Sequence, residues 1–179
     1  MKKLILIDGG PAAGKNTLGE LLVKRFNATG AKAILLDLDT YVEQLNPTWI
    51  WEIEEQKQQD QLTARVNIAE DIDKYLQQDF TVLVIGERLL TKEDVARFVL
   101  RLKTSAPTYL YHLHVPFVLR EKRLHNRGPH NLIDLAKDQK DRDEINDWPG
   151  YVYENVNSAE VDAGNLLVLI NGGVGEQKD

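Results

Sequence analysis

The chain has 179 residues, which is the usual size of one globular domain with a well-developed core. Its 22 Lys and Arg and 28 Asp and Glu residues give a net charge of −6, so a long nucleic acid is not an expected partner. The absence of cysteine excludes disulfides and thiolate zinc sites, and no apolar run approaches the ~20 residues of a membrane span. We therefore expect a cytoplasmic protein that does not enter a membrane, and no oligomeric state is predicted.

Short apolar runs alternate with helical stretches along the chain. We predict strands at residues 4–7, 33–38, 80–85, 108–115 and 151–155. Apolar residues recur at helical spacing within residues 18–26, 62–76, 95–102 and 118–124, and a charged helical segment covers residues 132–145. At the end of the chain, a helix over residues 158–170, with Asn157 and Glu160 at capping-box spacing, competes with a strand at residues 166–170, and we favour the helix. This alternation predicts a parallel sheet with helices on both faces.

The turn after the first strand carries the pattern G-x-x-x-x-G-K and opens the first helix. Its residues are Gly9, Gly10, Pro11, Ala12, Ala13, Gly14, Lys15, Asn16 and Thr17. In such a loop, backbone N–H groups and the helix N-terminus hold phosphate oxygens, while the lysine reaches the β- and γ-phosphates. We therefore expect all nine residues to bind ATP. The alternative is a glycine-rich turn without a ligand, in which Lys15 would have no evident role.

Asn16 stands where such loops usually place Ser or Thr to hold magnesium, and Thr17 comes one position later. The string resembles the G-G-P-G-S-G-K-G-T loop of the adenylate kinase group of nucleoside monophosphate kinases, which also lacks a hydroxyl directly after the lysine. The resemblance implies an α/β, three-layer P-loop NTPase fold. It also implies a five-stranded parallel sheet in the order 2-3-1-4-5, helices on both faces, a short lid, and a single kinase domain over residues 1–179. ATP and Mg2+ are the implied cofactors.

Two carboxylates, Asp37 and Asp39, follow the second strand at the edge of the sheet where α/β proteins bind ligands. The alternation of a strand places both on one face. In shikimate kinase and similar small-molecule kinases, a D-x-D at this place serves magnesium and the acceptor hydroxyl. By that resemblance Asp39 is the candidate general base, and Asp37 assists magnesium together with Asn16. The alternative is that one of the two aspartates caps the next helix.

Arg123 and Arg127 lie at i and i+4 just before Gly128, and Arg142 lies in the next helical segment. An R-x-x-x-R pair similarly opens the lid of the monophosphate kinases. The resemblance implies a lid over about residues 127–142, in which Arg123 stacks on the base while Arg127 and Arg142 bind phosphates and stabilise the transition state. The alternative is a solvated charged helix in which Arg120 and its neighbours face water.

The third strand ends in the sequence Ile85, Gly86, Glu87, Arg88. The adenylate kinases read D-G-x-P-R here, so Ile85 replaces the acidic residue that usually assists magnesium, and Glu87 is the nearest substitute. Arg88 is a candidate ligand of the acceptor, and the E-R pair is also similar to the E-R-S of deoxyribonucleoside kinases. The alternative is a surface ion pair of little energetic value.

The acceptor is less well defined than the donor. Trp49 is a candidate for stacking on the acceptor, and core packing is the better interpretation for one of the two tryptophans Trp49 and Trp51. Residues 41–76 hold only one arginine, Arg65, which favours a neutral hydroxyl over a phosphate. The four histidines show no ligand spacing and are assigned structural roles.

These residues together predict an ATP-dependent kinase for a small acceptor such as a nucleoside, a nucleotide or a hydroxylated metabolite. The alternative function is a nucleotide-binding switch without metabolic turnover. GTPases of this fold carry an N-K-x-D motif, and the chain contains none. The kinase is therefore the favoured function.

Overall fold

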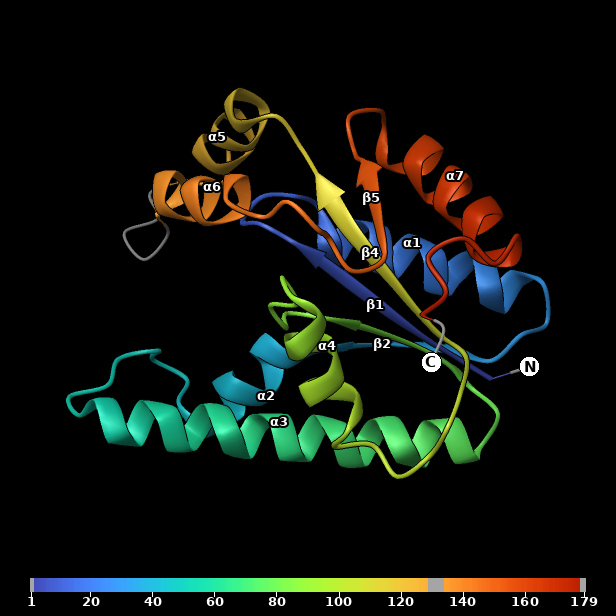
Figure 1. The fold of residues 1–179 in the computed structure, drawn as a ribbon, viewed down its shortest axis with the longest axis horizontal. Coiled ribbons are helices and arrows are strands. Elements are labelled where there is room, and N and C mark those ends of the chain that lie inside the picture. The colour runs from blue at the N-terminus through green and yellow to red at the C-terminus, as the bar shows by residue number, and fades with distance from the viewer. Residues whose placement is uncertain (1, 129–133, 178–179) are drawn as a thin grey trace.

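The computed structural model describes residues 2–128 and 134–177 and shows one parallel sheet between two layers of helices (Figure 1). The five strands are β1 (Lys3–Gly9), β2 (Ala33–Asp37), β3 (Thr81–Ile85), β4 (Thr108–His114) and β5 (Tyr151–Glu154). Their order across the sheet is β2-β3-β1-β4-β5, and every neighbouring pair is parallel. The predicted strand order is therefore confirmed. Because the strands are parallel, all their carboxyl ends meet at one edge of the sheet.

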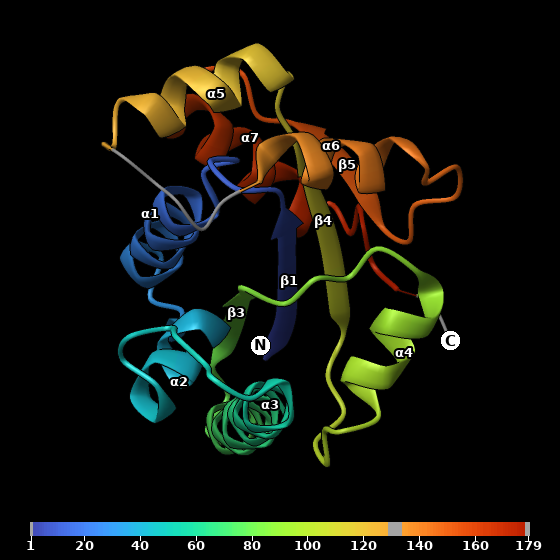
Figure 2. The same ribbon diagram turned by 90° about the vertical axis from the view of Figure 1, so that its left-hand side faces the viewer.

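The helices connect the strands as crossovers. They are α1 (Lys15–Ala28), α2 (Leu38–Leu45), α3 (Glu54–Gln77), α4 (Lys92–Val99), α5 (Phe117–His125), α6 (Leu135–Asp143) and α7 (Ala159–Asn171). The helices α1 and α7 cover one face of the sheet, and α3 and α4 cover the other, while α5 and α6 lie over the carboxyl ends of the strands (Figure 2). None of the helices within the described ranges is both long and apolar enough to cross a membrane.

The central strand β1 divides the core into two layers. Ile5 and Ile7 pack with Leu22 of α1, whereas Leu4 and Leu6 pack with α3 on the opposite face. All four β1 side chains are buried. Burial on both faces explains why this strand is a continuous apolar run rather than an alternating one.

The helix α3 has a start that the sequence pattern left undefined. It begins at Glu54, and the first two members of its predicted apolar stripe, Leu62 and Val66, are 50% and 45% exposed. A 24-residue helix is about 36 Å long, whereas a five-residue strand such as β3 spans about 17 Å. The N-terminal half of α3 therefore extends past the sheet (Figure 1). The helix α4 is shorter than predicted because it ends at Val99.

The closing segment is a helix, as favoured, but its cap differs from the prediction. Ser158 is the N-cap of α7, and its hydroxyl accepts a hydrogen bond from the Val161 N–H. Asn157 instead donates its backbone N–H and side-chain amide to the buried carboxylate of Asp162. Glu160, the second half of the predicted capping box, pairs with Arg25. The predicted capping box is therefore wrong.

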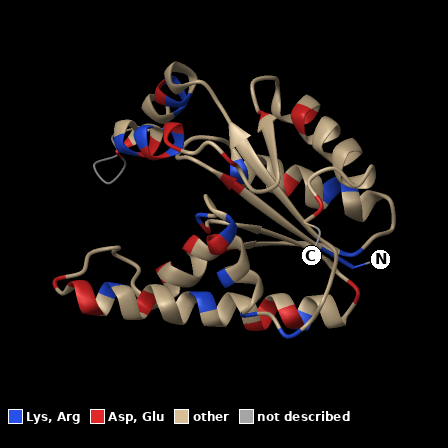
Figure 3. Ribbon diagram, viewed as in Figure 1, with Lys and Arg blue, Asp and Glu red and all other residues tan. Residues whose placement is uncertain are grey.

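The predicted lid begins just after α5 and covers all but the last residue of α6. Residues 129–133 of this lid lie outside the described residues. The helix predicted over residues 132–145 is observed over residues 135–143, with the Asp134 side chain accepting a hydrogen bond from the Lys137 N–H as its N-cap. Charges of both signs alternate along α5 and α6 (Figure 3).

Candidate active site

The glycine-rich loop connects β1 to the N-terminus of α1. Gly14 caps α1 with a φ of 92°, a left-handed conformation that glycine adopts without steric cost. The Lys15 Nζ folds back over the loop and donates hydrogen bonds to the carbonyl oxygens of Gly9 (2.7 Å) and Gly10 (3.3 Å). Burial lowers the pKa of Lys15, and the Asp8 carboxylate opposes that shift. The loop thus surrounds an ammonium group at a helix N-terminus, which is a suitable arrangement for binding phosphate.

The side chains of Asn16 and Asp37 meet beside this loop. The Asn16 amide donates a 3.0 Å hydrogen bond to the Asp37 carboxylate. Asp37 is the last residue of β2 and the N-cap of α2, because its carboxylate accepts a hydrogen bond from the Asp39 N–H. Asp39 lies in the first turn of α2, so the expectation that both aspartates share a face of one strand is wrong and the capping alternative is correct. A helical turn brings the two carboxylates to the same corner of the site.

Asp39 is partly open to solvent, yet its ionisation is perturbed. Loss of hydration in the cleft raises the pKa of Asp39, and the neighbouring Asp37 raises it further, while Lys15 acts in the opposite direction. Amide and carboxylate oxygens from Asn16 and Asp37 fit the hard oxygen ligands of Mg2+. Within the described ranges no group of three or more His, Cys, Asp or Glu residues could hold a metal ion. The donor set therefore fits a magnesium ion whose other ligands are phosphate oxygens and water.

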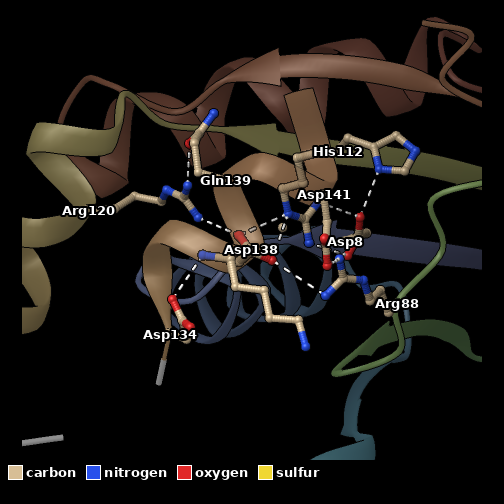
Figure 4. A network of polar contacts seen from close by, with 12 residues as sticks. Asp8, Arg88, His112, Arg120, Asp134, Asp138, Gln139 and Asp141 are labelled. Carbon is tan, nitrogen blue, oxygen red and sulfur yellow. Dashed lines mark hydrogen bonds and ion pairs between the residues drawn. The ribbon is translucent and has the colours of Figure 1, made fainter. Parts of the chain in front are cut away.

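The sequence analysis did not identify Asp8 as a site residue. Its side chain, at the end of β1, is buried and accepts hydrogen bonds from both Arg142 Nη atoms, at 2.9 and 3.2 Å (Figure 4). His112 Nδ1 lies 3.0 Å from the same carboxylate. Burial alone would raise the pKa of Asp8, but the hydrogen bonds to His112 and Arg142 hold it well below its ordinary value. The available signal was a lone acidic residue between a buried strand and the glycine-rich loop.

His112, which was assigned a structural role, extends this contact to the next loop. Its Nε2 lies 2.6 Å from the carbonyl oxygen of Pro149, and its ring packs against Trp148 with centroids 4.6 Å apart. The segment that leads into β5 is therefore fixed against β4 directly behind Asp8. This packing restricts the orientation of the imidazole and, through it, of the Asp8 carboxylate.

Ion pairs continue from Asp8 across α6, and we call these residues the α6 network (Figure 4). Arg142 also bonds to Asp138 at 3.1 Å, and Arg120 bonds to the same carboxylate at 2.7 Å. Arg88 pairs with Asp141 at 2.8 Å and approaches Asp138 at 3.7 Å. Three arginines from three segments thus meet at Asp138, and α6 is held against the glycine-rich loop and the segment that follows β3.

Arg120 is 3% exposed, so it does not face water as the alternative reading of this helix assumed. Its guanidinium and the Asp138 carboxylate lie so close to Gly10 that a Cβ atom at position 10 would collide with both. The second glycine of the loop is therefore required by the approach of the α6 network. Burying these charges is tolerable because each carboxylate is hydrogen-bonded to an arginine.

The other predicted arginines occupy different surroundings. The Arg123 guanidinium lies 3.5 Å from the carbonyl oxygen of Ala12 and 3.3 Å from that of Asn155, so α5 contacts the loop directly. Burial lowers the pKa of Arg123. Arg127 is exposed beyond the C-terminus of α5 and makes no ion pair within the described part of the chain.

Glu87 and Trp49 have partners away from the loop. Both oxygens of the Glu87 carboxylate accept hydrogen bonds from Arg65 Nε, at 2.9 and 3.1 Å, so Glu87 pairs with α3 rather than with its neighbour Arg88. Trp49 packs edge-on against Trp51, with centroids 6.0 Å apart, next to the core layer under α2 and α3. Both tryptophans are partly buried against this layer, which fits core packing and leaves part of each side chain accessible.

No protein-family model matches the sequence, and no curated protein matches it significantly. Solved structures do resemble it. A sugar kinase from a Janibacter species has a TM-score of 0.66 at 14% identity, and the alignment covers 96% of this chain and 95% of the kinase. The APS kinase of Mycobacterium tuberculosis, solved with AMPPNP and APS, has a TM-score of 0.64 at 16% identity and coverages of 95% and 98%.

A shikimate kinase from Acinetobacter baumannii, solved with shikimate, has a TM-score of 0.57 at 22% identity, with 95% of this chain and 93% of the kinase aligned. At these levels of identity the similarity defines the fold. The chain therefore has the fold of P-loop kinases over nearly its whole length, as the loop motif and strand order predicted.

Proposed function

We propose that this protein is an ATP-dependent kinase that transfers the γ-phosphate of ATP to a hydroxyl group of a small acceptor. The observation that carries the proposal is the position of Lys15. Its ammonium lies inside the glycine-rich loop at the N-terminus of α1, close enough to Asp37 and Asp39 for both carboxylates to influence its pKa. A phosphate-binding cation beside two carboxylates is the minimum that phosphoryl transfer to a hydroxyl requires.

On the donor side, the loop residues 9–17 would surround the phosphates and, apart from Pro11, bind them through their N–H groups, with Lys15 on the β- and γ-phosphates. Asn16 and Asp37 would hold Mg2+, which when bound neutralises charge on the β- and γ-oxygens. Arg123 would stack on the base, a role supported by its contact with the Ala12 carbonyl. Because ATP is abundant in the cytoplasm, we also propose a cytoplasmic location.

On the acceptor side, Asp39 would orient the hydroxyl and accept its proton. The hydroxyl oxygen attacks the γ-phosphorus, the bond from that phosphorus to the bridging oxygen breaks, and ADP leaves with the bonding electrons. A raised pKa makes Asp39 a better base than an ordinary aspartate at neutral pH. Arg88 and Trp49 are the proposed acceptor contacts, and their separate surroundings indicate that they would contact different parts of it.

Arg127 and Arg142 would close over the phosphates and stabilise the transition state. In the structure Arg142 is paired with Asp8 and Asp138. Binding the γ-phosphate would therefore require Arg142 to exchange Asp8 for a phosphate oxygen. The exposed position of Arg127 leaves it free to move toward the nucleotide.

The test is the conversion of ATP to ADP with pooled acceptors: nucleosides, nucleoside monophosphates, sugar acids and hydroxylated antibiotics. The Lys15→Ala variant is the blank, because it removes the phosphate-binding cation and keeps the loop backbone. One pool should stimulate turnover by the wild type and not by the variant. Tight ATP binding with no stimulation by any pool would contradict the kinase and favour the nucleotide-binding switch.

A further inference from the structure

A cavity of about 420 Å3 lies between α3, α4 and the segment that joins β3 to α4. We call it the arginine cavity, because Arg65, Arg88, Arg97 and Arg101 line it together with only two carboxylates, Glu87 and Asp94. Its lining therefore carries two more positive than negative charges. The whole chain has a net charge of −6, so the charge of this lining is opposite in sign to the net charge of the protein.

The floor of the cavity holds a fixed guanidinium group. Glu87 is 10% exposed at its side chain, and both of its oxygens accept from Arg65 Nε. Arg65 Nη1 reaches the carbonyl oxygen of Gln61 at 3.4 Å, and Nη2 has no hydrogen-bond partner among the residues that the structure describes. A guanidinium has five N–H donors, so Arg65 is held in place by Glu87 while several donors remain available.

The rim of the cavity holds two arginines with weak or no partners. Arg97 approaches Asp94 only to 3.8 Å, which is outside hydrogen-bond distance. Arg101 makes no ion pair within the described ranges. Side chains of like charge brought together without counterions repel one another, so an anion between them would relieve that repulsion.

Arg88 connects the arginine cavity with the candidate active site. It lines the cavity and pairs with Asp141 and Asp138 of α6. Asp138 binds Arg142, which binds Asp8 directly before the glycine-rich loop. A short series of ion pairs thus leads from the edge of the cavity to the strand that carries the loop. Arg88 therefore borders both the arginine cavity and the ion pairs that hold α6 against the glycine-rich loop.

We propose that the arginine cavity binds an anionic group of the acceptor, a carboxylate or a phosphate, while the acceptor hydroxyl is presented to ATP at the loop. The proposal rests on the proposed kinase function and names its substrate class. Arginine suits this role because its planar fork pairs with carboxylate and phosphate oxygens. The proposal revises the expectation of a neutral acceptor. That expectation was based on the arginines of residues 41–76 and did not consider Arg97 and Arg101 on the side of α4.

A binding experiment tests the cavity without relying on turnover. Inorganic phosphate and citrate serve as probes, titrated calorimetrically into wild-type protein whose loop is already filled with AMPPNP and Mg2+. The double variant Arg97→Gln with Arg101→Gln should bind the better probe at least about ten-fold more weakly, since the loss of a single charged hydrogen bond already weakens binding by a factor of this order. The control is Lys24→Gln with Lys122→Gln, two exposed lysines whose replacement changes the net charge equally.

A second measurement addresses the acceptor itself. Hydroxylated acceptors with a carboxylate or phosphate should stimulate ATP turnover more than neutral ones, and the arginine double variant should raise the acceptor KM about ten-fold without changing the KM for ATP. Equal probe binding by the double variant and its lysine control, or preference for neutral acceptors, would overturn the proposal. If no acceptor stimulates turnover while probe binding still depends on Arg97 and Arg101, the kinase proposal fails and the anion site stands.

Discussion

Asp8 and Arg142 are joined by two hydrogen bonds, 2.9 and 3.2 Å long, although 134 residues separate them in the chain. One residue ends the apolar part of the central strand, and the other lies on α6, above the carboxyl edge of the sheet. The pair therefore ties the candidate lid helix to the base of the glycine-rich loop. Because both side chains are largely buried, each depends on the other for its charge to be tolerated.

Replacing Asp8 should destabilise the protein. Asp8→Asn removes one of the two buried carboxylates that pair with Arg142 and leaves Asp138 as the other, and removing one partner of a buried pair typically costs about 3–5 kcal/mol. Urea unfolding at pH 7 measures the loss. Glu121→Gln, an exposed residue on α5, is the control and should change the free energy of unfolding by less than about 0.5 kcal/mol. Equal stabilities of the two variants would contradict a stabilising role for the pair.

The same pair predicts a pH dependence of stability. Folding lowers the pKa of Asp8, so its contribution is fully present above the unfolded-state pKa of about 4 and is lost as the pH falls below that value. The difference in unfolding free energy between wild type and Asp8→Asn should therefore be constant from about pH 6 to 8 and shrink at about pH 3. If this difference in unfolding free energy grew as the pH fell, folding would raise the pKa of Asp8 rather than lower it.

Replacing Asp39 should impair catalysis more than binding. If Asp39 accepts the proton of the acceptor hydroxyl, Asp39→Asn should lower kcat about 10²–10⁴-fold with the Kd for ATP unchanged. Because the pKa of Asp39 is raised, the acidic limb of the wild-type profile of kcat/KM against pH should lie above the ordinary aspartate range. Glu43→Gln, on the exposed side of α2, should leave both quantities unchanged.

Alanine substitutions at two glycines with similar backbone conformations should distinguish the effect of backbone strain from that of steric crowding. Gly86 has a φ of 88°, and a Cβ atom there would lie 2.7 Å from an Asp37 oxygen, whereas Gly30 has a φ of 82° and open space around it. Alanine at either position should cost about 1–2 kcal/mol for the left-handed backbone. Only Gly86→Ala should also displace Asp37 and raise the Mg2+ concentration needed for ATP turnover. If both variants need the same Mg2+ concentration for ATP turnover, Asp37 does not contribute to magnesium binding.

The parts of the fold that follow from local patterns could be predicted from the sequence. A continuous apolar run ending in a glycine-rich turn specifies a buried parallel strand and a phosphate loop, because those residue types act over only a few positions. The exposure of Leu62 could not be predicted in this way. It depends on how far the sheet extends beneath α3, and no local pattern contains that length.

The sequence likewise predicted only part of the candidate site. The spacing of the loop residues and of Asp37 and Asp39 was enough to identify them as candidates. The sequence did not predict that Asp39 lies on a helix, where its N–H donates the capping hydrogen bond to Asp37. The partner of Asp8 could not be predicted, since pairing over 134 residues is decided by the packing of α6. The arginine cavity was missed for a related reason: Arg65 of α3 meets the arginines of residues 88–101 only through the tertiary fold.

The ion pair of Asp8 also predicts how ATP binding should respond to its removal. If Arg142 binds the γ-phosphate as proposed, it must exchange Asp8 for a phosphate oxygen, and Asp8 also places a negative charge near Lys15. Asp8→Asn removes both obstacles, so at a temperature where the variant is folded the Kd for ATP should fall about ten-fold, which corresponds to about 1.4 kcal/mol. Titration calorimetry at low and high salt measures the effect, and screening should diminish it at high salt. Weaker ATP binding by Asp8→Asn would instead mean that Asp8 positions Arg142 for the phosphates.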